Sequence, residues 1–258
     1  MTQITRQQIL DALDQDRFQL FGQPKWTFGR NTCHTYEVFV DLLISEDEER
    51  ILPDAFMPVI EADEQLTMRF GSWFLENAFA DCANLMDQLN MTLTISINIF
   101  GFQANRPEFI DQVQLMMARF GLTAQNIQFE LSERQPLNET GIRNLIRLRE
   151  ELNIRLVLGN FGMGFSTISL LRVIPFDLLE LSRDFTAKIT SNERDLTIAV
   201  AILQFAQVLD IKVCAKGIET AEQMELLEEA GFTMGQGYLI GRPMPMDELA
   251  AFVRKYAD

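Results

Sequence analysis

From residue 93 onward the sequence alternates between short apolar or β-branched runs and longer amphipathic stretches, and this alternation constrains the fold most. The expected strands in this part are LTISINIF, IQFELS, RLVLGNF, FDLLELS, KVCAKG and MGQGYLI. Helical patterns follow them over residues 107–120, 138–152, 166–173, 193–209, 221–230 and 247–256. Strand–helix units repeated in this way are typical of an α/β protein with a parallel sheet covered by helices.

The first third of the chain adds two more strands. We expect a helix over residues 5–15, the strands FQLFGQPKW and TYEVFVDLLI, and then helices over residues 53–62 and 66–89. With these two strands the total suffices to close a TIM-like (β/α)₈ barrel. Because no Pro/Gly/Ser-rich linker or shift in composition divides the chain, we expect one domain over residues 1–258.

The net charge and the cysteines limit which partners and which cellular compartment we expect. The formal net charge of −15 argues against direct nucleic-acid binding, since nothing is available to replace the counterions of a phosphate backbone. Cys33, Cys82 and Cys214 are widely separated and have no metal-ligand spacing, which fits a reducing compartment. No apolar run is long enough to span a membrane, so we expect a cytoplasmic protein without a membrane segment.

Polar residues recur at the ends of the expected strands. In (β/α)₈ barrels the functional groups lie at the C-terminal ends of the strands. Burying so many polar side chains is costly unless they meet one another or a ligand. The residues concerned are Glu37, Asn98, Glu130, Glu133, Gly159, Asn160, Glu180, Ser182, Lys216, Glu219 and Gln236.

The motifs around these residues resemble a known family. The series YEVF, SINIF, FELSE, NFGMGFST, LELSRDF, AKGIE and QGYLIGRPMP is similar to the EAL domain, which hydrolyses cyclic di-GMP, over about residues 18–246. The resemblance implies the EAL type of (β/α)₈ barrel, in which one strand is antiparallel.

The resemblance also implies that the metal site of active members has been dismantled here. Residual metal-ligand positions fall on Glu37, Asn98, Glu130 and Glu219. The paired aspartates of active members fall on Gly159 and Asn160, a lysine falls on Glu180, and the general base falls on Lys216.

The chemistry of the substituted residues argues against hydrolysis. Two-metal hydrolysis needs carboxylates that hold the ions and lower the pKa of the attacking water. Gly159 offers no ligand, Asn160 offers only a neutral carbonyl, and a protonated Lys216 cannot accept a proton. We therefore expect a degenerate, non-catalytic domain with no bound metal, no cofactor and no requirement for Mg²⁺ or Mn²⁺.

Glu180 and Lys216 together exchange the charges that the family has at these two positions. We predict that the Lys216 ammonium pairs with Glu180, or with Glu37, Glu130 and Glu219, and so replaces the charge of the lost metal. The alternative is independent drift at two positions.

Two regulatory functions follow, with different partners. The first is a protein-interaction module that binds an unknown regulatory protein. The second is a metal-independent cyclic di-GMP receptor; a weak phosphodiesterase ranks last. An aspartate, Asp41, stands where the family has a phosphate-contacting arginine, which counts against nucleotide binding. The candidate nucleotide-binding residues are Gln23, Pro24, Glu37, Asn98, Glu130, Glu219 and Gln236.

A homodimer is also implied. Glu133, Phe165 and Ser166 match the loop region that supports dimerisation in the family.

Overall fold

The computed structural model describes residues 4–43, 50–132, 136–162 and 167–257. Its strands are β1 (Phe18–Thr27), β2 (Thr32–Leu43), β3 (Arg50–Ile51), β4 (Thr94–Ile99), β5 (Ile127–Ser132), β6 (Arg155–Phe161), β7 (Leu178–Leu181), β8 (Lys212–Lys216) and β9 (Met234–Gln236). Its α-helices are α1 (Arg6–Asp14), α2 (Pro53–Glu61), α3 (Glu64–Leu89), α4 (Gly101–Ala104), α5 (Phe109–Phe120), α6 (Glu139–Glu150), α7 (Thr167–Leu171), α8 (Arg183–Thr186), α9 (Glu193–Val208), α10 (Ala221–Ala230) and α11 (Met246–Lys255).

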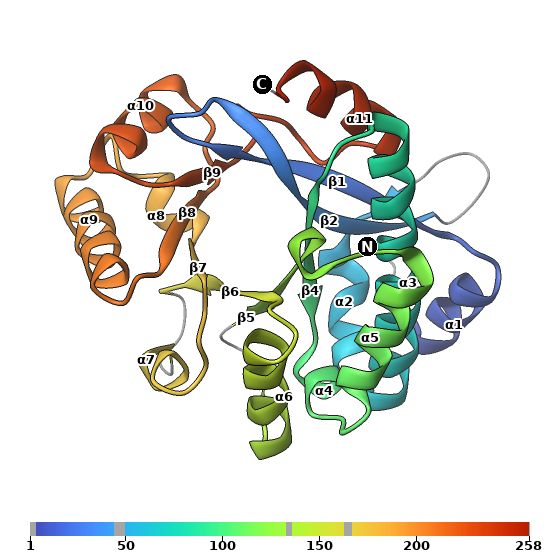
Figure 1. Ribbon diagram of the computed structural model, residues 1–258. Coiled ribbons are helices and arrows are strands. Elements are labelled where there is room, and N and C mark those ends of the chain that lie inside the picture. Colours follow the sequence, from blue (N-terminus) through green and yellow to red (C-terminus); the bar gives the residue numbers. More distant parts are fainter. Residues whose placement is uncertain (1–3, 44–49, 133–135, 163–166, 258) are drawn as a thin grey trace.

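The sheet closes on itself as a barrel. Its order is β1-β9-β8-β7-β6-β5-β4-β2, and β1 also pairs with β2, while β3 extends β2 outside the ring. β1 is antiparallel to both of its neighbours, whereas the other pairs within the ring are parallel. The helices surround these strands, with α9 and α10 on one side and α3 and α5 on the other (Figure 1). The predicted (β/α)₈ barrel with one antiparallel strand is confirmed.

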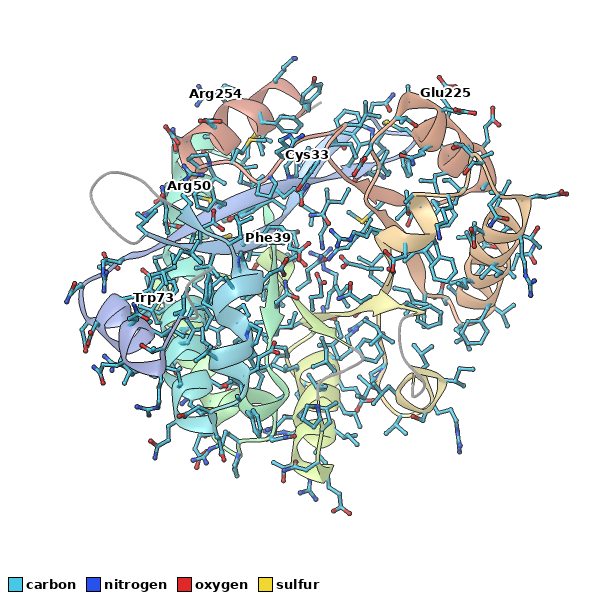
Figure 2. The ribbon with its side chains drawn as sticks, turned by 180° about the vertical axis from the view of Figure 1, so that it is seen from behind. Cys33, Phe39, Arg50, Trp73, Glu225 and Arg254 are labelled. Carbon is cyan, nitrogen blue, oxygen red and sulfur yellow. The ribbon has the colours of Figure 1, made fainter. Side chains whose placement is uncertain are left out.

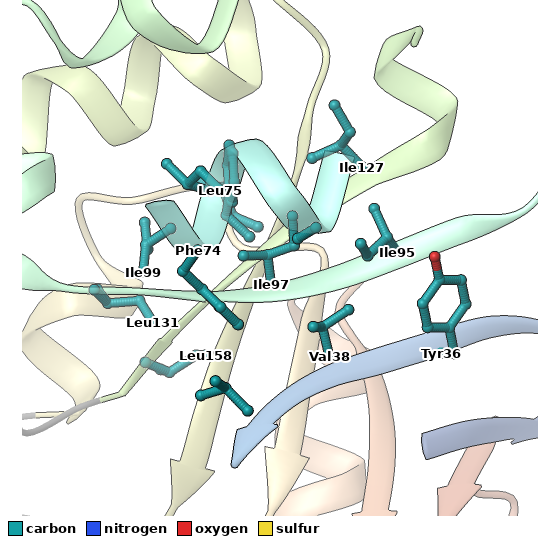
Figure 3. Close-up of a cluster of buried hydrophobic side chains, with 14 of the residues drawn as sticks. Tyr36, Val38, Phe74, Leu75, Ile95, Ile97, Ile99, Ile127, Leu131 and Leu158 are labelled. Atoms are coloured by element: carbon teal, nitrogen blue, oxygen red, sulfur yellow. The ribbon is translucent and has the colours of Figure 1, made fainter. Parts of the chain in front are cut away.

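The core between barrel and helices follows from strand alternation. Figure 3 shows Phe74 and Leu75 of α3 against Ile95, Ile97 and Ile99 of β4, and all five are at most 5% exposed. Burying such a side chain stabilises the fold by about 1.5–3 kcal/mol. Because successive strand residues point to opposite faces, the residues between these isoleucines point into the barrel.

The barrel interior is layered. Val157, Leu178, Cys214 and Met234 form a small apolar cluster separate from the main core. Each of them lies two positions before a residue of the next layer, in the order Gly159, Glu180, Lys216 and Gln236. With a side-chain period of two, this apolar layer lies directly beneath a layer of largely polar residues, on the N-terminal side of the strands.

Some boundaries differ from the sequence expectation. The predicted strand MGQGYLI supplies strand only over Met234–Gln236. A Cβ at Gly237 would lie 2.1–2.6 Å from backbone atoms of Ile218, so this residue belongs to a close backbone contact. The short helices α4 and α8 directly follow β4 and β7 and were not predicted. Within the described ranges, no helix combines the length and hydropathy that crossing a membrane requires.

Candidate functional site

Five charged side chains from five strands meet inside the barrel. Lys25 comes from β1, Glu37 from β2, Glu130 from β5, Glu180 from β7 and Lys216 from β8. We call these five residues the charge cluster. The side chains of Lys25 and the three glutamates are at most 2% exposed, and that of Lys216 is 17% exposed at the mouth side.

Lys216 lies between the three carboxylates. Its Nζ is 3.0 Å from Oε2 of Glu37, 2.8 Å from Oε1 of Glu130 and 2.5 Å from Oε2 of Glu180. The predicted ion pairing of Lys216 is therefore confirmed for these three glutamates. Glu219 is exposed and is not among the ion-pair partners of Lys216 in the described part of the chain.

Lys25 supplies a second, fully buried ammonium that the sequence interpretation missed. Its Nζ is 2.5 Å from Oε1 of Glu180 and 3.5 Å from Oε2 of Glu130. It also donates to the Ser96 hydroxyl at 3.0 Å. The available signal was strand alternation from Gln23, which places residue 25 on the same inward face. A buried ion needs compensating charges and hydrogen bonds, and these partners provide them.

The charges fix one another's protonation. Burial by itself would lower the pKa of Lys25 and Lys216, but the surrounding carboxylates outweigh it and raise both pKa values above the ordinary lysine range. Burial would raise the pKa of Glu180, yet Lys216 and Lys25 outweigh it and lower that pKa. Burial, reinforced by Glu180 and Glu37, raises the pKa of Glu130. Both lysines therefore remain ammonium ions, and Lys216 is not a proton acceptor at neutral pH.

Gly159 leaves room for one member of the cluster. A Cβ at this position would lie 2.6 Å from Oε1 and 3.0 Å from Cγ of Glu130. The Glu130 side chain thus occupies the space that a side chain at residue 159 would need. The next residue, Asn160, is exposed and has φ of 57°, in the left-handed region that asparagine tolerates better than most residues.

The remaining predicted residues lie in different places. Gln23, Asn98 and Gln236 are on the inward faces of their strands, Pro24 is on the outer face of β1, and the carboxylate of Glu219 does not join the cluster. Asn98 donates to Oε1 of Glu37 at 2.9 Å, and Gln23 donates to the Gly241 carbonyl at 2.9 Å. Pro24 is buried, and a Cβ at Gly241 would lie 2.8 Å from its Cγ. Gln236 is 2% exposed, and its Nε2 has no hydrogen-bond partner among the described residues.

Two further positions lie along the barrel mouth. Burial raises the pKa of Asp41, and the charge of Arg50 opposes this shift. Arg50, at the open end of the β1–β2 hairpin (Figure 2), stacks its guanidinium over the Phe21 ring at 4.5 Å. Ser182 is buried and its hydroxyl accepts from the Asp184 amide, capping α8. Glu133, Phe165 and Ser166 lie outside the described residues.

A family model, described as EAL domain, matches residues 6–243. The chain belongs to the EAL domain family. It is 31% identical over 253 residues to the cyclic di-GMP phosphodiesterase NbdA of Pseudomonas aeruginosa, an alignment that covers 97% of this chain and 32% of NbdA. RocR, another cyclic di-GMP phosphodiesterase of Pseudomonas aeruginosa, is 26% identical over 240 residues, which are 92% of this chain and 60% of RocR. Across four of the curated relatives, the chain spans only 24% to 32% of their length.

Solved EAL structures share the fold. The EAL enzyme Bd1971, in a form bound to cAMP and cyclic di-GMP, superposes with a TM-score of 0.90 at 28% identity, covering 96% of this chain and 67% of that chain. The PaMucR phosphodiesterase in complex with c-di-GMP gives a TM-score of 0.84 at 25% identity, covering 94% of this chain and 99% of that chain.

The residues present in this EAL barrel do not fit a divalent metal. One oxygen of each of Glu37, Glu130 and Glu180 lies within 4.8 Å of the others, as in a metal-ligand set. The Lys216 ammonium, however, is within 3.0 Å of all three carboxylates, and Lys25 closes the buried side. A divalent cation at the same place would meet two positive charges instead of free oxygen ligands.

Proposed function

We propose that this EAL barrel is a non-catalytic regulatory domain that acts by binding another protein in cyclic di-GMP-related signalling. The observation that carries the proposal is the position of Lys216 among three carboxylates. A general base must accept a proton, and the raised pKa of Lys216 opposes that role. Hydrolysis assisted by metal ions also needs open carboxylate ligands, and both lysines engage those ligands.

The absence of hydrolysis is directly testable. Incubating the protein with an equal concentration of cyclic di-GMP and excess Mg²⁺ or Mn²⁺ is expected to yield no linear dinucleotide by chromatography, even after many hours. Product that increases with protein concentration and disappears in a Glu37→Gln variant would show that the barrel is an enzyme.

Helix α9 offers a surface for the proposed interaction. Its inner face buries Ala199, Leu203 and Ala206 against the barrel. Its outer face and its C-cap residue expose an apolar stripe, in which each residue is at least 36% exposed: Ile198, Phe205, Val208 and the C-cap residue Leu209. We call these four residues the α9 stripe. Exposed apolar patches of this kind mark protein contacts, and the helical spacing suits a second apolar helix. A second copy of this chain would supply such a helix through its own α9. This contact differs from the homodimer expected from the sequence, which was assigned to the loop of Glu133, Phe165 and Ser166.

Charges placed on the α9 stripe are expected to break this contact. In Phe205→Asp/Val208→Asp, the dissociation constant of the homodimer is expected to rise about 100-fold or more, since two carboxylates would have to be desolvated. Sedimentation equilibrium measures the change. Leu115→Asp is the matched control, because Leu115 is 71% exposed on α5, across the barrel from α9 (Figure 1). A monomeric wild type, or an equal effect of the control, would contradict self-association through α9.

A second candidate function is a metal-independent receptor for cyclic di-GMP. It is favoured by the buried Nε2 of Gln236, which lacks a hydrogen-bond partner among the described residues and is free to donate to a ligand. The ligand-bound relatives Bd1971 and PaMucR have similar barrels. The carboxylate of Asp41 opposes it, because a phosphodiester beside a carboxylate is repelled.

Titration calorimetry in the presence of a chelator tests this receptor function. Asp41→Arg is expected to bind cyclic di-GMP about tenfold more tightly than wild type, because a charge-assisted hydrogen bond replaces a repulsion. Glu225→Arg on the outer side of α10 (Figure 2) makes the same change of charge away from Asp41 and should leave affinity unchanged. Equal affinity of wild type and Asp41→Arg would show that Asp41 does not limit binding.

A further inference from the structure

We infer that Lys25 and Lys216 together replace bound divalent cations, and that the barrel retains a latent metal site which removal of the Lys216 ammonium uncovers. The inference concerns what holds the barrel interior together. It does not depend on which protein or nucleotide the domain binds.

The positions of the two ammonium groups support the replacement. Lys216 contacts the carboxylates of Glu37, Glu130 and Glu180 from the mouth side. Lys25 approaches the same three carboxylates at 3.9, 3.5 and 2.5 Å from the buried side. The three glutamates thus lie between two ammonium groups, whose positive charges compensate the carboxylates as bound cations would.

The charges of the cluster also support the inference that the two lysines replace bound cations. Three carboxyl groups lie in a nearly water-free interior, where an isolated charge is costly. Burial raises the pKa of Glu130, whereas the two ammonium groups lower the pKa of Glu180 and so stabilise its ionised form. Without Lys216 the cluster would lose one of its two positive charges and would leave a space lined by carboxyl oxygens. Hard divalent cations prefer this kind of site.

Gly159 also supports the replacement of cations by lysines, because it leaves space for Glu130 beside Lys216. Oε1 of Glu130 accepts a hydrogen bond from Lys216. A Cβ at residue 159 would lie only 2.6 Å from this same oxygen. A side chain at this position would therefore require the Glu130 carboxyl group to shift from its contact with Lys216. If residue 159 had changed to glycine independently of the cluster, the Glu130 carboxylate would not need to occupy the space beside it.

Mn²⁺ titration followed by electron paramagnetic resonance tests the latent site, because bound Mn²⁺ loses its free-ion signal. The proteins compared are wild type, Lys216→Met and Lys212→Met. Lys212 lies at the start of the same strand, β8, but is exposed, so its replacement removes one positive charge outside the cluster. Wild type and Lys212→Met are expected to show only the weak, non-stoichiometric binding of an acidic surface. Lys216→Met is expected to bind one Mn²⁺ per chain at least about tenfold more tightly, because a positive charge has been removed from the ligand set.

Two additions make the test decisive. Adding Glu130→Gln to Lys216→Met should abolish the stoichiometric site, which assigns the ion to the cluster. If Lys216→Met is destabilised without metal, its thermal unfolding is followed with increasing Mn²⁺, where binding to the folded state should raise its Tm. The Tm of wild type should be the same with a chelator and with millimolar Mn²⁺. Stoichiometric Mn²⁺ binding by wild type that Glu130→Gln removes, or a folded Lys216→Met with no Mn²⁺ site, would overturn the inference.

Discussion

Replacing Lys25 by methionine is expected to lower the free energy of unfolding by about 3–5 kcal/mol, the usual effect of removing one partner from a buried ion pair. Lys25 is fully buried and lies 2.5 Å from Glu180, whose carboxylate is itself 0% exposed. Methionine has a similar length and no charge, so packing is largely kept while Glu180 loses its cation on the buried side. The Ser96 hydroxyl also loses its donor.

Urea denaturation measures this loss as a lower midpoint at unchanged m-value. Lys212→Met, which removes an exposed lysine, is the control and should leave the midpoint unchanged. Combining Lys25→Met with Glu180→Met should recover part of the loss, because an apolar pair of similar volume leaves fewer buried charges without partners. A Lys25→Met protein as stable as the control would show that the buried ammonium does not hold the cluster together.

Placing an aspartate at residue 159 is expected to destabilise this protein. In Gly159→Asp the Cβ would approach Glu130 Oε1 to 2.6 Å, so the Glu130 side chain must shift from its position beside Lys216. The added carboxylate also lies next to the carboxyl group of Glu130 in a buried environment. We expect a loss of about 2–4 kcal/mol in the free energy of unfolding, combining overpacking with an unpaired charge.

A double-mutant cycle separates the steric part. Gly159→Ala introduces only the Cβ, and we expect it to cost about 1–3 kcal/mol. In a Glu130→Ala background the same change should cost clearly less, because the atoms that the Cβ would meet are gone. Equal costs in the two backgrounds, measured by urea denaturation, would show that Gly159 and Glu130 are not coupled.

Both predictions test whether the residues of the charge cluster depend on one another. Independent residues would each contribute separately to stability. Coupling of Lys25, Gly159, Glu180 and Lys216 through Glu130 and Glu37 is expected from the contacts, since each lysine lies within 4.0 Å of all three glutamates.

The architecture and much of the charge cluster could be predicted from the chain alone. Alternating strand and helix patterns predict a parallel sheet covered by helices with enough strands to close a barrel, whereas the one antiparallel strand followed from the resemblance to the EAL domain. The motif series also indicated which strand ends meet, and the opposite charges of Glu180 and Lys216 indicated an ion pair. These inferences depend on local periodicity and on the rule that parallel strands end at one rim.

Only the tertiary structure placed Lys25 in the cluster and left the Glu219 carboxylate outside it. Lys25 and Glu180 are 155 positions apart, and they meet because the barrel closes through the antiparallel strand β1. The same closure directs Glu130 over Gly159 and turns one apolar face of α9 outward. A sequence pattern specifies the face on which a side chain lies. The partner that it meets across a closed barrel depends on register and on the space that neighbouring side chains leave, and these exist only once the sheet is complete.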